Sequence, residues 1–91
     1  MMITYPAVFR KTAEGNWHCD FVDLNGCYGD GDTLDACIDD AIDSERAWIM
    51  ARLTEEEDLP KVTQPDEVTL RPGEEVRNIG AIIKLMDGWE E

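Results

Sequence analysis

The chain lacks any apolar run close to the roughly 18 residues that a membrane-spanning helix needs. Its first residues also lack a basic segment followed by an apolar stretch and a small-residue cleavage site. We therefore expect a soluble protein that works in the cytoplasm and has no membrane partner.

Basic residues are scarce. Eight lysines and arginines stand against 21 aspartates and glutamates, which gives a formal net charge of −13. A chain with this balance repels phosphate backbones and attracts basic proteins. Direct binding to DNA is thus unexpected, and a basic protein is the expected partner.

The length of 91 residues leaves room for one small domain, which we place at residues 1–91. A chain of this size buries only about 60–65% of its unfolded surface, so its stability is limited. Self-association into a dimer or tetramer is expected on this ground.

The three cysteines are odd in number, and their spacing fits neither a zinc ribbon nor a redox pair. A mixed metal site formed by His18 with Cys19, Cys27 and Cys37 is disfavoured, because neighbours on a strand point to opposite faces of the sheet. His18, the single histidine, has no nucleophile beside it and is expected on the polar outer face of a strand. We therefore predict no cofactor, no metal and no catalytic residue.

Two runs rich in β-forming residues, 3–10 and 17–22, flank Gly15 and Asn16, which is a hairpin signal. In the second run Trp17, Cys19 and Phe21 alternate with polar residues, as in a half-buried strand. A short third strand at 26–29 would complete a meander.

One helix follows, with Asp32 or Thr33 as its expected N-cap. Apolar residues at helical spacing should pack on the sheet, namely Leu34, Ile38, Ala41, Trp48 and Ile49. The acidic run at 55–58 lies beside the negative end of the helix dipole, so we expect fraying before Pro60.

The end of the chain allows two interpretations. Residues 61–66 are expected to form a connector, and 76–86 satisfies both strand and helix spacing. Three isoleucines, a valine and Gly80 favour the strand. The sequence therefore predicts an α+β fold of order β-β-β-α-β: a small antiparallel three-stranded meander, one main helix packed on it, then a further strand.

Several residues in this order resemble the HicB family of antitoxins. The resemblance covers residues 5–60 and leaves 61–91 as connector and final strand; it is carried by Tyr5, Pro6, Ala7, Gly15, Phe21, Asp23, Leu24, Gly26, Cys27, Gly31, Asp32, Thr33, Ala36 and Ala41. It implies a partial RNase H-like fold. Val22 and Asn25 depart from the family pattern, which usually has proline at both positions.

HicB proteins commonly carry a DNA-binding module at the carboxyl terminus. Here residues 61–91 hold four basic residues against seven acids and show no pair of helices with a basic face. We therefore expect a HicB-like protein without that module.

The resemblance implies an antitoxin that neutralises a small basic HicA-type toxin, an mRNA-cleaving ribonuclease, by covering its RNA-binding and active surface. Two aromatic residues are the candidate apolar anchors and six acids the candidate charged contacts: Trp17 and Tyr28, with Asp20, Asp30, Asp35, Asp39, Asp40 and Asp43. These acids also fit an ordinary solvated surface.

Two other functions compete with the antitoxin. An orphan HicB-like module would oligomerise and bind proteins without any toxin partner. A nuclease would use clustered carboxylates, with Asp20, Asp23, Asp30 and Asp32 as the candidates, but it also needs a basic surface that the chain lacks. We therefore predict that the protein is not an enzyme.

Overall fold

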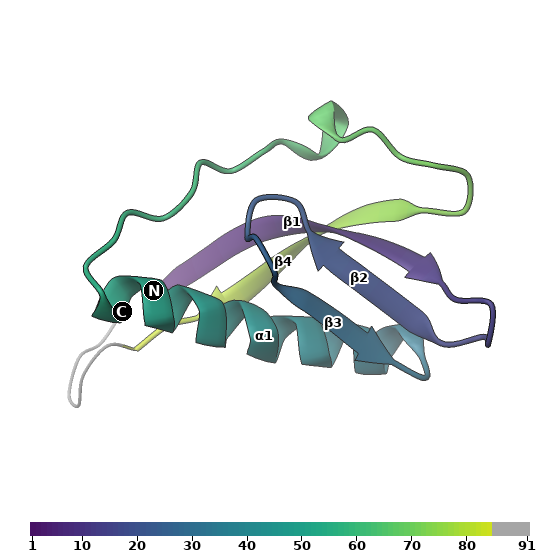
Figure 1. Cartoon of the computed structure of the whole chain (residues 1–91), viewed down its shortest axis with the longest axis horizontal. Helices are drawn as coiled ribbons and strands as arrows, with labels where there is room; N and C mark the ends of the chain where they lie inside the picture. Colours follow the sequence, from purple (N-terminus) through teal and green to yellow (C-terminus); the bar gives the residue numbers. More distant parts are fainter. Residues whose placement is uncertain (85–91) are drawn as a thin grey trace.

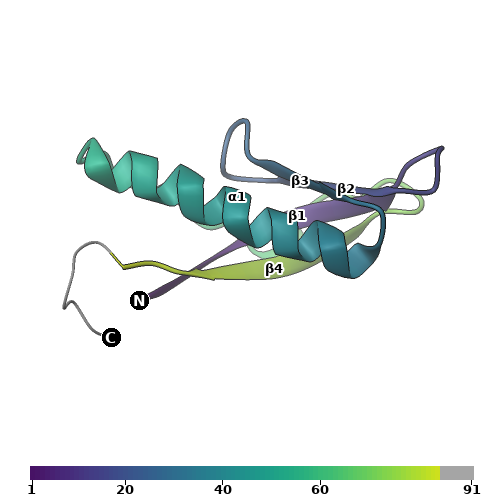
Figure 2. The same ribbon diagram turned by 90° about the horizontal axis from the view of Figure 1, so that it is seen from below.

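A computed structural model describes residues 1–84. Its elements, in chain order, are β1 (Met2–Lys11), β2 (Trp17–Phe21), β3 (Tyr28–Gly31), α1 (Leu34–Thr54), the short 3₁₀ helix η1 (Pro65–Glu67) and β4 (Glu75–Ile82). The strands form one antiparallel sheet of order β3-β2-β1-β4. Figures 1 and 2 show α1 lying along one face of this sheet. The predicted α+β fold of order β-β-β-α-β is confirmed.

The predicted hairpin joins β1 and β2. Gly15 has a φ of +90°, a conformation that glycine adopts at little cost, and its amide donates to the carbonyl of Thr12. Pro6 lies within β1, where its missing N–H would weaken a central strand. It is tolerated because the ladder between β1 and β2 begins at Ala7 and Phe21. Pro6 lies just before this ladder, and its carbonyl accepts from the Val22 amide.

The third strand exists, but its bounds differ from the predicted 26–29. Gly26 has a φ of +80° and belongs to the turn, where the amide of Cys27 donates to the carbonyl of Leu24. The strand therefore begins at Tyr28. Its Gly31 lies directly against α1, because an added Cβ would come within 2.4 Å of the Cys37 amide nitrogen.

The helix starts as predicted, with Thr33 rather than Asp32 as its N-cap: the Thr33 hydroxyl accepts from the Ala36 amide at 3.1 Å. It ends at Thr54, so the acidic run lies beyond the helix. The residues predicted to face the sheet are buried or partly buried. Two further buried residues of α1, Cys37 and Glu45, were not predicted.

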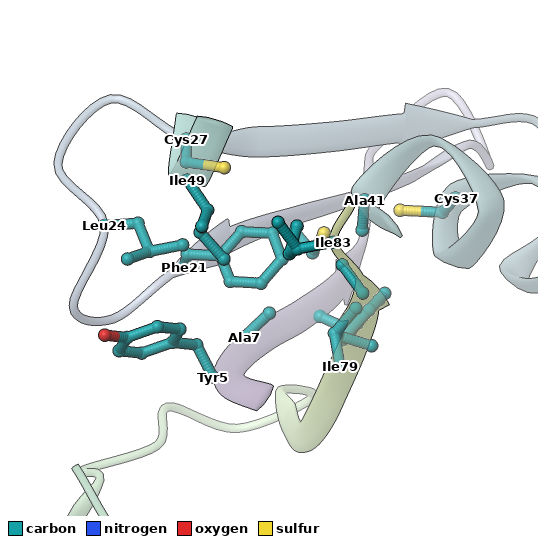
Figure 3. Close-up of a cluster of buried hydrophobic side chains, with 13 residues drawn as sticks. Tyr5, Ala7, Phe21, Leu24, Cys27, Cys37, Ala41, Ile49, Ile79 and Ile83 are labelled. Carbon is teal, nitrogen blue, oxygen red and sulfur yellow. The ribbon is translucent and has the colours of Figure 1, made fainter. Parts of the chain in front are cut away.

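The core lies between α1 and the sheet (Figure 3). Every strand except β3 contributes large side chains, for instance Tyr5, Phe21 and Ile79. β3 has glycines at the positions that face α1, because the helix lies so close that no side chain would fit between them. The helix consequently approaches β3 more closely than a side chain there would allow.

A long connector leads from α1 to β4 (Figure 1). It is fastened at two points: the Tyr5 hydroxyl donates to the carbonyl of Pro60, and Asp23 accepts from Thr63. The chain then forms β4, which pairs with β1 from Met2 to Phe9. The strand prediction for 76–86 is confirmed for 76–82 and wrong for 83 and 84, which follow the strand, and positions 85 and 86 lie outside the described residues.

Candidate protein-binding surface

One edge of the sheet is formed by β3. The Phe21 amide donates to the carbonyl of Cys27, and hydrogen-bonded pairs alternate along an antiparallel ladder. With the register that pairs Cys19 with Gly29, the backbone groups of Tyr28 and Asp30 must point away from β2. These groups form an edge without a neighbouring strand, on which a side chain of α1 binds the Asp30 amide, and a further strand could pair with it.

A groove of about 600 Å³ runs between this edge and α1. Its described lining comes from the turn before β3, from β3 itself and from one side of the helix: Gly26, Cys27, Tyr28, Asp30, Asp40, Ser44, Ala47 and Trp48. On the helix side the groove thus has one acidic and one aromatic residue, Asp40 and Trp48, and no described lining residue is basic.

Two hydrogen bonds and one cation–π contact hold the walls of the groove. The Asp40 carboxylate accepts from the Asp30 amide at 2.9 Å, which ties the first half of α1 to the strand edge. At the other end the Trp48 indole N–H donates to the carbonyl of Asn25 at 2.9 Å, and the Arg52 guanidinium lies 4.6 Å from the centre of that ring. The guanidinium therefore interacts with the face of the indole.

A second cluster lies on the sheet face away from α1. His18 Nδ1 lies 2.6 Å from Asp30 Oδ1, and Nε2 lies 3.1 Å from Asp20 Oδ2, while Arg10 approaches Asp20 at 3.4 Å. The Tyr28 ring stacks on the imidazole, with 5.7 Å between ring centres. Burial alone would lower the pKa of His18, but hydrogen bonds and charge from Asp30 and Asp20 together raise it above the ordinary value.

The predicted partner-binding residues fall on several surfaces. Only Tyr28, Asp30 and Asp40 line the groove. Trp17 is partly buried and lines a separate depression beside Asp32, and Asp20 belongs to the histidine cluster. The three remaining acids are exposed on α1 outside the groove: Asp35, Asp39 and Asp43. Trp48 was predicted only as a core residue, and its helical spacing gave no signal for a place at the groove.

Other groups with potential chemistry are held in structural roles. Asp23, a candidate for the nuclease site, binds Thr63. Burial raises the pKa of the Cys27 thiol to about 11 and also raises those of Cys19 and Cys37, so the thiolate forms are disfavoured. His18 and Cys19 lie on opposite faces of β2, as predicted. No group of three histidine, cysteine or acidic residues within 1–84 is arranged to hold a metal ion.

The fold and this surface define a small acidic β-β-β-α-β domain with an open sheet edge. Residues 5–87 match the family model described as "HicB_like antitoxin of bacterial toxin-antitoxin system", and the chain belongs to this family. The resemblance drawn from the sequence is thereby confirmed. Within the described part of the chain, no helix is both long and apolar enough to cross a membrane.

Solved structures show the same fold. A chain of the "HicA3 and HicB3 toxin-antitoxin complex" is 25% identical, with a TM-score of 0.65 over 90% of this chain and 99% of that one. A toxin-antitoxin complex from Streptococcus pneumoniae gives a TM-score of 0.82 at 11% identity, covering 100% and 79%. The N-terminal domain of Burkholderia pseudomallei HicB gives 0.74 at 16%, covering 85% and 95%. No curated protein matches the sequence.

Proposed function

We propose that this protein is an antitoxin that binds a small, basic HicA-type toxin and covers the surface with which the toxin holds and cuts mRNA. Membership of the HicB-like antitoxin family supports the antitoxin role. The observation in this structure that supports the proposal most directly is the edge of β3, which has Asp40 and Trp48 of α1 on one side and the side chains of Tyr28 and Asp30 on the other.

The physical basis is competition with RNA phosphates for a basic surface. A net charge of −13 accelerates the encounter with a cationic protein, and aromatic side chains that become buried slow its release. Neutralisation needs no reaction at this surface, so we propose that the protein acts in the cytoplasm by binding and not as an enzyme. Direct DNA binding is no part of this mechanism.

Capture from the native host tests the proposal. A tagged chain should retain a small basic protein that dissociates as salt rises and that cleaves RNA once it is freed. Asp40→Lys should weaken this complex more than Asp58→Lys, which makes the same charge change at an exposed position after α1. Equal effects of the two variants would show that the groove does not contact the toxin.

An orphan oligomerising module is the second candidate. Met2 and Ile82 pair across β1 and β4 and are 64% and 54% exposed, which gives the opposite side of the molecule an apolar patch. Dimers or tetramers formed through that patch would bury it. Recovery of only the chain itself, as an oligomer of defined size, would favour this function over the antitoxin.

A further inference from the structure

We propose that the open edge of β3 takes up an extended basic segment of the protein partner as an added antiparallel strand, seated in the groove beside α1. The identity of the partner rests on the proposed function. The docking mode rests on three features of this structure: the outward backbone groups of β3, the charge of the groove, and the position of Asp40.

The first feature is the set of outward backbone groups on β3. Tyr28 and Asp30 direct their amides and carbonyls away from β2, because the alternate residues Gly29 and Gly31 bond to it. Strand addition uses such groups for affinity and uses flanking pockets for the choice of side chains. The four outward groups of β3 match two residues of an incoming strand.

The groove supplies the flanking pockets. Gly29 lets α1 approach so closely that an added Cβ would lie 2.9 Å from the Ala41 backbone. This contact places Asp40, Ser44 and Trp48 of the same helix beside the strand edge, where they line the groove. Side chains alternate along a strand, so one set of an added strand would face this wall and the other would face Tyr28.

The negative charge beside the strand edge favours a basic segment of the partner. The Asp40 carboxylate is exposed in the groove, where no described lining residue is a lysine or arginine, whereas the Asp30 carboxylate lies on the other face of β3 beside His18. A segment with lysine or arginine at alternate positions would present these cations on one side, where they can lie beside the Asp40 carboxylate. An acidic segment would be repelled.

The Asp40 carboxylate already binds one outward amide of β3 in the free protein. Its Oδ2 accepts the Asp30 amide at 2.9 Å, where a carbonyl of an added strand would otherwise bind. The carboxylate thus protects the edge from unspecific pairing in the free protein. An incoming strand replaces this bond with its own carbonyl and leaves the carboxylate to pair with one of its cations.

Amide exchange on the whole 15N-labelled chain tests the docking mode with a defined probe. The probe is a capped hexapeptide of alternating lysine and valine, and its control is the same peptide N-methylated at every residue. We expect the first to slow exchange of the Tyr28 amide by about tenfold or more, and the second to leave it unchanged. Equal binding of both peptides, or changes confined to β4, would overturn the proposal.

A pair of variants at one position separates backbone from side chain. Tyr28→Pro removes the outward N–H and leaves the ladder to β2 intact, while Tyr28→Ala removes only the ring. Each variant is first checked by its circular dichroism spectrum. The proline variant should bind the peptide about three- to tenfold more weakly than the alanine variant, the effect of one lost hydrogen bond. Equal affinities would overturn strand addition.

Different results would overturn the antitoxin function and the docking mode. Peptide binding at β3 without recovery of a toxin would support the docking mode and overturn the antitoxin function. Recovery of a toxin whose complex leaves exchange at Tyr28 unchanged would support the function and overturn the docking mode.

Discussion

Asp23 binds Thr63 through both of its carboxylate oxygens: the Thr63 amide donates to Oδ2 at 2.8 Å and the hydroxyl to Oδ1 at 2.6 Å. The two residues lie 40 positions apart in the sequence. The pair joins the turn before β3 to the connector that leads to β4. An acid that the sequence offered as a candidate nuclease carboxylate therefore holds the connector in place.

Asp23→Ala should release this part of the connector. Both Thr63 donors would lose a charged acceptor, so the free energy of unfolding should fall by about 1–3 kcal/mol in urea titrations. Thr63→Ser keeps both donors and serves as the control, with a smaller loss expected. A stability equal to that of the unmodified protein in Asp23→Ala would mean that the connector is held elsewhere.

Gly31→Ala should disturb the packing of α1 on β3. The new Cβ would lie 2.4 Å from the Cys37 amide nitrogen and 2.7 Å from the carbonyl carbon of Ala36, so the helix backbone has to move. Such overpacking costs about 1–3 kcal/mol and occasionally more. Loss of near-ultraviolet circular dichroism should accompany the lower melting temperature.

Gly15→Ala is the matched control for this substitution. Its φ of +90° is strained for alanine, yet no atom lies within 4 Å of the added Cβ. The cost should be about 1 kcal/mol and should leave the tertiary signal unchanged. A larger loss in Gly15→Ala than in Gly31→Ala would contradict the close approach of helix and strand.

Glu45 should make stability fall as pH rises. The residue is fully buried, and neither carboxylate oxygen has a hydrogen-bond partner within the described residues. Burial raises its pKa to about 8, although the backbone of Tyr5 and the charge of Arg46 act in the opposite direction. The folded protein thus keeps a proton that the unfolded chain releases above its ordinary pKa of about 4.5.

The loss should extend from about pH 4.5 to about pH 8 and reach roughly 3 kcal/mol at pH 7. Glu45→Gln removes the ionisation, so the urea midpoint should no longer fall between pH 4.5 and pH 6.5, below the range in which His18 acts. Glu14→Gln, at an exposed hairpin position, should keep the original profile. An unchanged profile in Glu45→Gln would show that the carboxyl group is solvated.

His18 should act above pH 6.5, in a range that overlaps the upper part of the Glu45 range. Its raised pKa means that the folded protein binds a proton more tightly than the unfolded chain does. The resulting stabilisation is complete below the unfolded value of about 6.5 and is lost as pH rises through the folded value. In His18→Gln this pH-dependent part should disappear.

Nuclear magnetic resonance titration of the imidazole measures the same effect directly. Asp30→Asn removes the charge at 2.6 Å and should lower the pKa of His18, whereas Asp43→Asn, on the exposed side of α1, should leave it unchanged. A folded pKa at or below the ordinary value would contradict the arrangement of the cluster.

Local signals were enough to predict the main elements. The hairpin at Gly15, the cap at Thr33 and the alternation around Cys19 each depend on a few neighbouring residues, and each is confirmed. The order of the strands in space and the pairing of β1 with β4 arise from packing across the whole chain. Periodicity in one segment carries no information about that pairing.

The candidate surface was predicted less well, for a physical reason. Acids that follow one another in sequence diverge in space: Asp40 turns toward β3, whereas Asp39 is exposed outside the groove. Glu45 occupies a core position of α1 although it is an acid, which a hydrophobicity pattern scores as surface. Only the geometry of helix against sheet separates these cases.

The pairing of β1 with β4 has a consequence for synthesis of the protein. On the ribosome the first 54 residues can already form the hairpin, β3 and α1, but β1 waits for a partner strand that emerges about twenty residues later. Non-local pairing of this kind slows folding because a long loop has to close first. During that interval the edge of β1 that faces away from β2 stays unpaired and open to proteases and chaperones, so the pairing of β4 should make the chain resistant to them.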